Sequence, residues 1–133
     1  MITQLSQIRW GRVTLTALAV YILSFLTATL IVTGYATSLA FQARGAPDQT
    51  LITAFANQYA PWFGSISLIL FTILGAMHIT RRVDEAVEFH GIALGVLASL
   101  VNIVFDGLSL SALAITILTI GAGWLGSKLG NRK

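Results

Sequence analysis

The chain has 133 residues, of which 56% are hydrophobic and only 10% are charged. About a quarter of the residues of a soluble domain are charged, so the composition excludes an ordinary soluble protein and indicates one that resides in lipid. The absence of cysteine excludes disulfides, thiolate metal sites and cysteine nucleophiles. We expect a single domain, residues 1–133, with four membrane spans.

The first predicted span covers residues 13–41, which contain no charged side chain. A bilayer is crossed by about 20 apolar residues, and the apolar region of a cleavable signal peptide is only about 7 to 15 residues long. We therefore interpret this segment as a helix that stays in the membrane. Its last residues, from Thr33 onward, should project beyond the hydrocarbon on the outer side.

The segment 48–60 has the apolar spacing of an amphipathic helix. It either rests on the membrane surface or extends the first hairpin by packing on the end of the first span. In the second case an apolar extension would rise on the outer side, and we hypothesise that a partner docks there. The alternative is that the two arms satisfy one another or lie on lipid. The residues of this predicted docking surface are Tyr35, Leu39, Phe41, Leu51, Phe55 and Tyr59.

The remaining predicted spans cover residues 59–80, 86–105 and 108–127. Pro61 suits the first turn of the second span, because proline is tolerated there. Only a short turn separates the last two spans, and Asp106 in it can cap the fourth helix. The sequence thus predicts an all-α membrane bundle of two antiparallel hairpins, with the first hairpin extended on the outer side.

Basic residues predict the orientation, since short cytoplasmic loops retain Lys and Arg. Only Arg44 falls on the side opposite to the other basic residues, so we expect both termini in the cytoplasm. Asp84, in the loop between the second and third spans, can cap the third helix. The basic residues on the predicted cytoplasmic side are Arg9, Arg12, Arg81, Arg82, Lys128, Arg132 and Lys133.

Small residues at four-residue spacing predict close helix packing. We expect these two rows to pack the third span against the fourth, and a dimer interface is the alternative. The third span carries Gly91, Gly95 and Ser99, and the fourth carries Thr119, Gly123 and Ser127.

His78 and His90 lie at similar predicted depths, which is the minimum for a haem held by two histidines. No second pair and no third ligand accompanies them, so no metal site and no cofactor is predicted. We favour interfacial histidines close to water that bond to Glu88, a hydroxyl or water.

Enzyme and transport chemistry find little support in the spans. No Ser–His or paired-carboxylate constellation is present, and ionisable residues of the kind that mark ion pathways are few. A monomer of four helices is also expected to lack room for a useful substrate cavity. We therefore predict a non-enzymatic accessory, assembly or stabilising subunit. A small oligomeric transporter or channel is the alternative, and a tetrapyrrole-binding subunit is the third interpretation.

A pattern in the second half of the chain resembles a family. Gly75-Ala76, a basic loop, His90-Gly91, Gly95 and the ending GAGWLGSKLGNRK are similar to a family of small bacterial four-helix membrane proteins classed as a domain of unknown function. The resemblance implies a bacterial plasma membrane location. The expected partners are the lipid bilayer and either another membrane protein or a second copy, with no role for nucleic acid.

Overall fold

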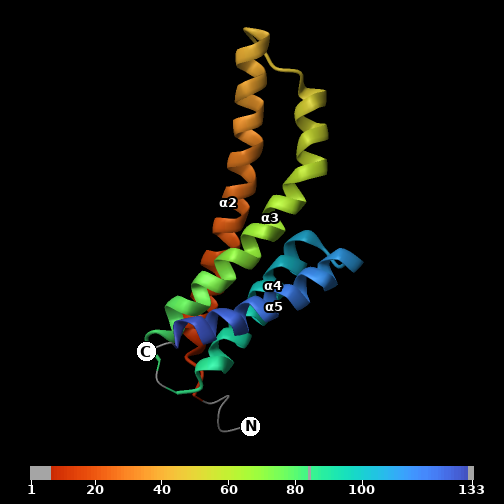
Figure 1. Cartoon of the computed structure of the whole chain (residues 1–133). Coiled ribbons are helices and arrows are strands. Elements are labelled where there is room, and N and C mark those ends of the chain that lie inside the picture. The colour runs from red at the N-terminus through yellow and green to blue at the C-terminus, as the bar shows by residue number, and fades with distance from the viewer. Residues whose placement is uncertain (1–6, 84, 132–133) are drawn as a thin grey trace.

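The computed structural model describes residues 7–83 and 85–131, and in these ranges it contains four helices and no strand (Figure 1). The helices are α2 (Trp10–Ala43), α3 (Gln49–Thr80), α4 (Val87–Asp106) and α5 (Leu110–Gly130). All four are long and apolar enough to cross a membrane. The all-helical fold with four long apolar helices is therefore confirmed. The expected cap by Asp84 lies outside the described residues, as do Arg132 and Lys133.

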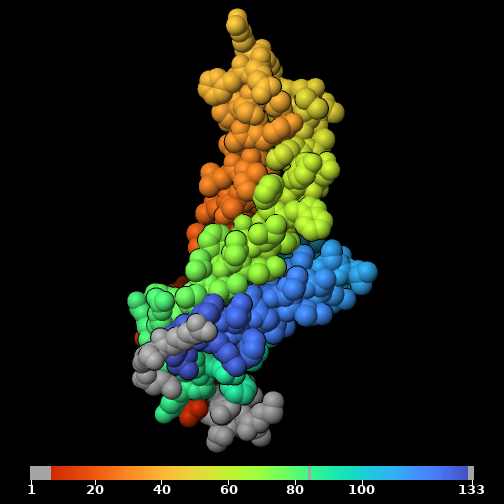
Figure 2. All heavy atoms as spheres, viewed as in Figure 1, coloured from red at the N-terminus to blue at the C-terminus, as the bar shows by residue number. Residues whose placement is uncertain are grey.

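The helices form two pairs of unequal length. α2 and α3 have 34 and 32 residues, and we call them the long pair; α4 and α5 have 20 and 21 residues and form the short pair. At 1.5 Å per residue the long pair reaches about 50 Å and the short pair about 30 Å. The short pair packs on one end of the long pair, and α2 and α3 continue alone beyond it (Figures 1 and 2).

α3 is one helix from Gln49 to Thr80, so the segment 48–60 extends the long pair. Asp48 caps it by accepting a hydrogen bond from the Thr50 N–H at 2.8 Å, and bonds from Thr50 lower the pKa of the Asp48 carboxyl. The expectation that Pro61 lies in a first helical turn is wrong, because the helix begins well before it. An interior proline cannot donate to the carbonyl four residues earlier, that of Asn57, and α3 changes direction along its length (Figure 1).

α5 packs closely on both α4 and α3 because the residues at these contacts have small side chains. A Cβ atom on Gly91 would overlap the carbonyl oxygen of Gly123. A Cβ atom on Gly95 would lie 2.7 Å from the carbonyl oxygen of Thr119. On its other face, a Cβ on Gly126 would lie 2.8 Å from the Cβ of Ala76 on α3. The backbones therefore approach as closely as small residues permit.

The turn between α4 and α5 differs from the expected one. Gly107, with a φ of 85°, ends α4 directly after Asp106. Ser109, not Asp106, caps α5, since its hydroxyl accepts a hydrogen bond from the Ala112 N–H at 3.1 Å. The expected cap by Asp106 is wrong because α5 starts only at Leu110, which makes Ser109 the residue at the cap position.

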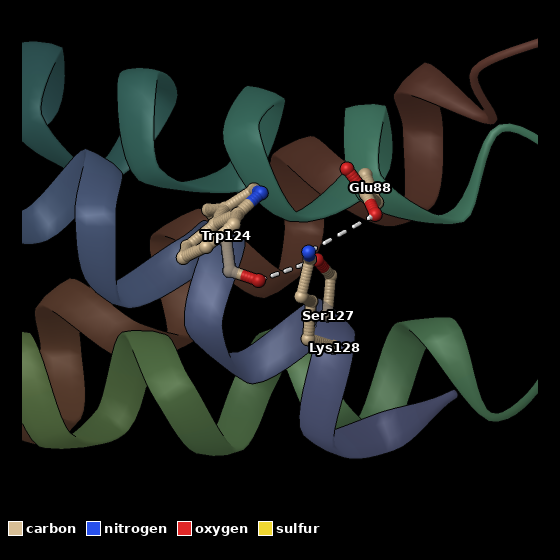
Figure 3. A network of polar contacts seen from close by, with 4 residues as sticks. All are labelled: Glu88, Trp124, Ser127 and Lys128. Atoms are coloured by element: carbon tan, nitrogen blue, oxygen red, sulfur yellow. Dashed lines mark hydrogen bonds and ion pairs between the residues drawn. The ribbon is translucent and has the colours of Figure 1, made fainter. Parts of the chain in front are cut away.

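All four helices have one terminus at the same end of the molecule, where α2 and α4 begin and α3 and α5 end (Figure 1). We call this the basic end. There Lys128 of α5 lies 3.8 Å from Glu88 of α4 and over the ring of Trp124 (Figure 3). Both charged side chains are about half exposed, so the ion pair contributes little to stability. Glu88 lies in the first turn of α4 and Lys128 in the last turn of α5. Both charges are favourable there, because the N-terminal end of a helix is partially positive and the C-terminal end partially negative.

Candidate functional site

A cleft of about 650 Å³ lies where the short pair ends against the long pair. Its walls are α2 between Tyr21 and Thr33, α3 between Ala56 and Ser65, and the turn from α4 to α5. Small-molecule sites in proteins measure about 300–1,000 Å³, so the expectation of too little room is wrong. That expectation assumed four helices packed along their whole length, whereas the short pair covers only part of the long pair (Figure 2).

Small side chains create the space in this cleft, which we call the step cleft. Ala28 of α2 faces Gly64 of α3, where a Cβ atom would lie 4.0 Å from that of Ala28. Ala60 and Pro61 continue the same wall along α3. At 1.5 Å per residue, the α2 wall from Tyr21 to Thr33 is about 18 Å long. The site is thus an elongated groove that follows the helix axes.

Hydroxyl groups are numerous along α2, and five of them are bonded within their own helix. Ser24 donates to the Val20 carbonyl at 2.7 Å and Thr29 donates to that of Phe25 at 2.9 Å. The protons of these hydroxyls are therefore used within the helix. The same back-bonding occurs at Thr27, Thr37 and Ser38.

Three stronger polar groups also line the step cleft. Asn57 belongs to α3, and Asn102 and Asp106 belong to α4. Below them the ring of Tyr21 stacks on Phe105, with centroids 5.1 Å apart, and ties α2 to the end of α4. The cleft therefore combines an apolar, small-residue wall with two amides and one carboxylate.

Some residues of the predicted docking surface pack between α2 and α3, and the others are exposed. The Tyr35 and Phe55 rings stack between α2 and α3 at 4.0 Å, and Leu39 is half-buried. Phe41, Leu51 and Tyr59 remain exposed. The outer ends of the long pair thus use part of this set to hold each other, and the step cleft begins on α3 at Ala56, beside Phe55.

Five of the six predicted packing residues, all except Ser99, are in the contact between α4 and α5. All six are buried, and Gly91 lies against both Gly123 and Ser127. Spacing alone did not reveal Gly126 and Gly130, because their partner is α3: a Cβ on Gly130 would lie 2.8 Å from the carbonyl oxygen of Met77.

His90 is fully buried, so the expectation that it lies near water is wrong for this residue. One ring nitrogen, Nδ1, lies 2.9 Å from the Ala86 carbonyl oxygen, and the other, Nε2, lies 3.2 Å from the main-chain N–H of Arg9. The arrangement fits a proton on Nδ1, with Nε2 as acceptor. Glu88 pairs with Lys128 instead. Because both nitrogens are engaged, neither is free to bind a haem iron in this conformation.

His78 is exposed, and it lines a second, smaller pocket of about 240 Å³ together with His90 and three arginines. In the part of the chain that the structure describes, no group of three or more His, Cys, Asp or Glu residues is arranged to hold a metal ion.

The fold and these two pockets define a class, an all-helical protein with four potential membrane spans and a largely apolar groove that contains a few polar groups. No protein-family model, curated protein or solved structure matches the chain. The family resemblance of the glycine pattern stays a prediction, and the function has to be argued from the site itself.

Proposed function

We propose that this chain is a non-enzymatic accessory or assembly subunit of a bacterial plasma membrane, which holds a transmembrane helix of another protein in the step cleft. In this proposal the long pair and the short pair are two antiparallel hairpins that span the bilayer. The long pair extends beyond the short pair on the outer side.

The distribution of basic residues supports this orientation. Arg9, Arg12, Arg82 and Lys128 lie at the basic end, and Arg44 lies at the opposite end of α2. Since short cytoplasmic segments retain Lys and Arg, the basic end faces the cytoplasm. The step cleft then extends from the outer half of the membrane to its outer surface, because its α2 wall starts at Tyr21, nine residues beyond Arg12, and ends at Thr33.

The observation that carries the proposal is the chemistry of the step cleft at this depth. Asn57, Asn102 and Asp106 line it. Asn102 lies one turn inside the outer end of α4, where acyl chains offer no hydrogen bonds to its amide, and Asn57 and Asp106 lie at the level of the outer headgroups. A partner helix with polar or basic side chains satisfies these groups, while Ala28 and Gly64 let its backbone approach closely. The groove length of about 18 Å accommodates roughly 12 residues of such a helix.

The test fills the groove with one larger side chain, and circular dichroism verifies that the variant is folded. Gly64→Leu places a larger side chain where only Ala28 lies within 4 Å. The matched control is Gly121→Leu on α5, whose Cβ position has no neighbour within 4 Å. Complexes extracted in mild detergent are compared by native gel and mass spectrometry. We expect about tenfold less partner with Gly64→Leu, which corresponds to ~1.4 kcal/mol of lost affinity.

Loss of the partner from both variants, or from neither, contradicts docking in the step cleft. A set of copurifying proteins alone does not support the proposal; the difference between the two leucine variants does.

Transport by an oligomer is the second candidate, and the volume of the step cleft with Asp106 in its wall favours it. A carboxylate in such a site selects a cationic substrate. In proteoliposomes, this function predicts uptake of a lipophilic cation that Asp106→Asn abolishes. Uptake that depends on Asp106 in the absence of any partner would replace the accessory role by transport.

A further inference from the structure

The smaller pocket at the basic end gathers arginine and histidine side chains from the ends of two helices. Arg9 and Arg12 come from the start of α2, and His78 and Arg82 come from the end of α3. Below them, Ile79, Val83 and the buried His90 close the pocket, which measures about 240 Å³. A water molecule takes up about 30 Å³ in the liquid, so a phosphate group fits with room for waters.

The pocket is held in shape by main-chain contacts. The Arg9 N–H donates to Nε2 of His90, whose Nδ1 in turn lies 2.9 Å from the Ala86 carbonyl. The start of α2 is thereby fixed to the start of α4, and the Arg9 guanidinium is not used in that contact. Arg82 follows the end of α3, where its N–H donates to the Ile79 carbonyl at 3.0 Å.

The start of α2 lacks the negative groups that normally stabilise a helix N-terminus. Arg9 at the cap position provides no side-chain hydrogen bond, and no acidic residue is present in the first turn. That turn instead contains Arg12. Cations are unfavourable at this positive end of the helix dipole, and a bound anion offsets them.

Among the described residues, none of those that line the pocket is acidic. In the described part of the chain, the carboxylate of Glu88 is paired with Lys128 on α5. A ligand that enters this pocket therefore meets guanidinium groups, which bind phosphate oxygens in a bidentate manner.

We propose that this pocket binds the phosphate of an anionic phospholipid from the cytoplasmic leaflet. The leaflet follows from the proposed topology, in which the basic end is cytoplasmic, and basic pockets between helices on that side suit anionic headgroups. The acyl chains extend along the exposed side of α2, where Leu15 is 70% and Leu18 is 44% exposed. The lipid site needs the bilayer of the proposed function and does not need the partner helix.

The experiment uses the full-length protein, delipidated in detergent, and native mass spectrometry with added phosphatidylglycerol or phosphatidylcholine. We expect phosphatidylglycerol adducts that Arg12→Gln weakens roughly fivefold and that the double variant Arg12→Gln/Arg82→Gln weakens roughly 25-fold, at about fivefold per basic residue. Arg44→Gln is the matched control, since this arginine follows the other end of α2. Circular dichroism verifies that each variant is folded, and Arg12→Gln alone keeps the test valid if the double variant fails to fold.

Several results overturn the proposal. One is that the wild type and the folded Arg12→Gln variant bind phosphatidylglycerol equally well. Another is that Arg44→Gln weakens phosphatidylglycerol binding as much as Arg12→Gln does. Inorganic phosphate at millimolar concentration distinguishes the two sources of phosphate: if it binds in the pocket and displaces the lipid completely, the ligand is a soluble phosphate. Loss of an acidic protein from the double variant, with lipid binding unchanged, assigns the pocket to a protein. Because none of these variants touches the step cleft, failure here leaves the partner-docking test intact.

Discussion

The imidazole of His90 joins the start of α4 to the start of α2, because it accepts a hydrogen bond from the N–H of Arg9, 81 residues earlier in the sequence. His90→Ala leaves the Arg9 N–H without its acceptor and opens a cavity beneath it. We expect the free energy of unfolding to fall by about 2–4 kcal/mol, measured by denaturant or thermal unfolding in detergent. His78→Ala is the control, since this side chain is exposed and its loss should change stability by less than about 0.5 kcal/mol. Equal effects of the two substitutions would contradict the role of His90 as a structural link.

At this scale the sequence could place both histidines near one end of their helices but could not tell them apart. Their difference comes from long-range contacts: the start of α2 folds over His90 and not over His78. No local spacing reports such a contact. The cap of α5 was missed for a related reason, because a shift of a few residues in the start of a helix decides whether Asp106 or Ser109 occupies the cap position.

At the scale of elements, the contact of α4 with α5 depends on the mutual approach of Gly91 and Gly123. Gly91→Ala introduces a Cβ that overlaps the Gly123 carbonyl, so the two backbones have to separate. We expect a loss of about 1–3 kcal/mol of stability, as for other overpacked sites, visible as a lower melting temperature in detergent. Gly121→Ala has open space around its Cβ position and should not lower stability. A Gly91→Ala protein as stable as this control would contradict the close contact.

The four helices could be predicted because long apolar runs are themselves the signal for a membrane span. The residues at which the helices begin and end could not be predicted, because hydropathy indicates which residues can lie in lipid and a helix can continue beyond them. α3 continues through Pro61 because the upstream segment packs on α2 through Phe55 and Tyr35. The step cleft was missed because it depends on how the short pair packs on the long pair, and residues such as Gly126 that set this packing show no partner in the sequence.

At the scale of the whole molecule, the proposed topology predicts the sides of three reporter fusions. Reporters after Arg82 and after Lys133 should be cytoplasmic, and one inserted near Asp48 should be outside, because nearly all basic residues lie on one side of the spans. Paired activity reporters that work only on one side of the membrane measure this. A cytoplasmic reporter at Asp48 would contradict the orientation and would move the step cleft to the other leaflet.

Site-specific photocrosslinking in the native membrane shows whether a helix of another protein occupies the step cleft. A photoreactive residue replaces Asn57 in the step cleft, and the control replaces Leu74, which lies on the same helix outside the cleft and is 57% exposed. We expect a discrete adduct with another membrane protein from position 57, which is absent from position 74 and lost when Gly64→Leu is added. No protein adduct from position 57, or the same adducts from both positions, would contradict this expectation.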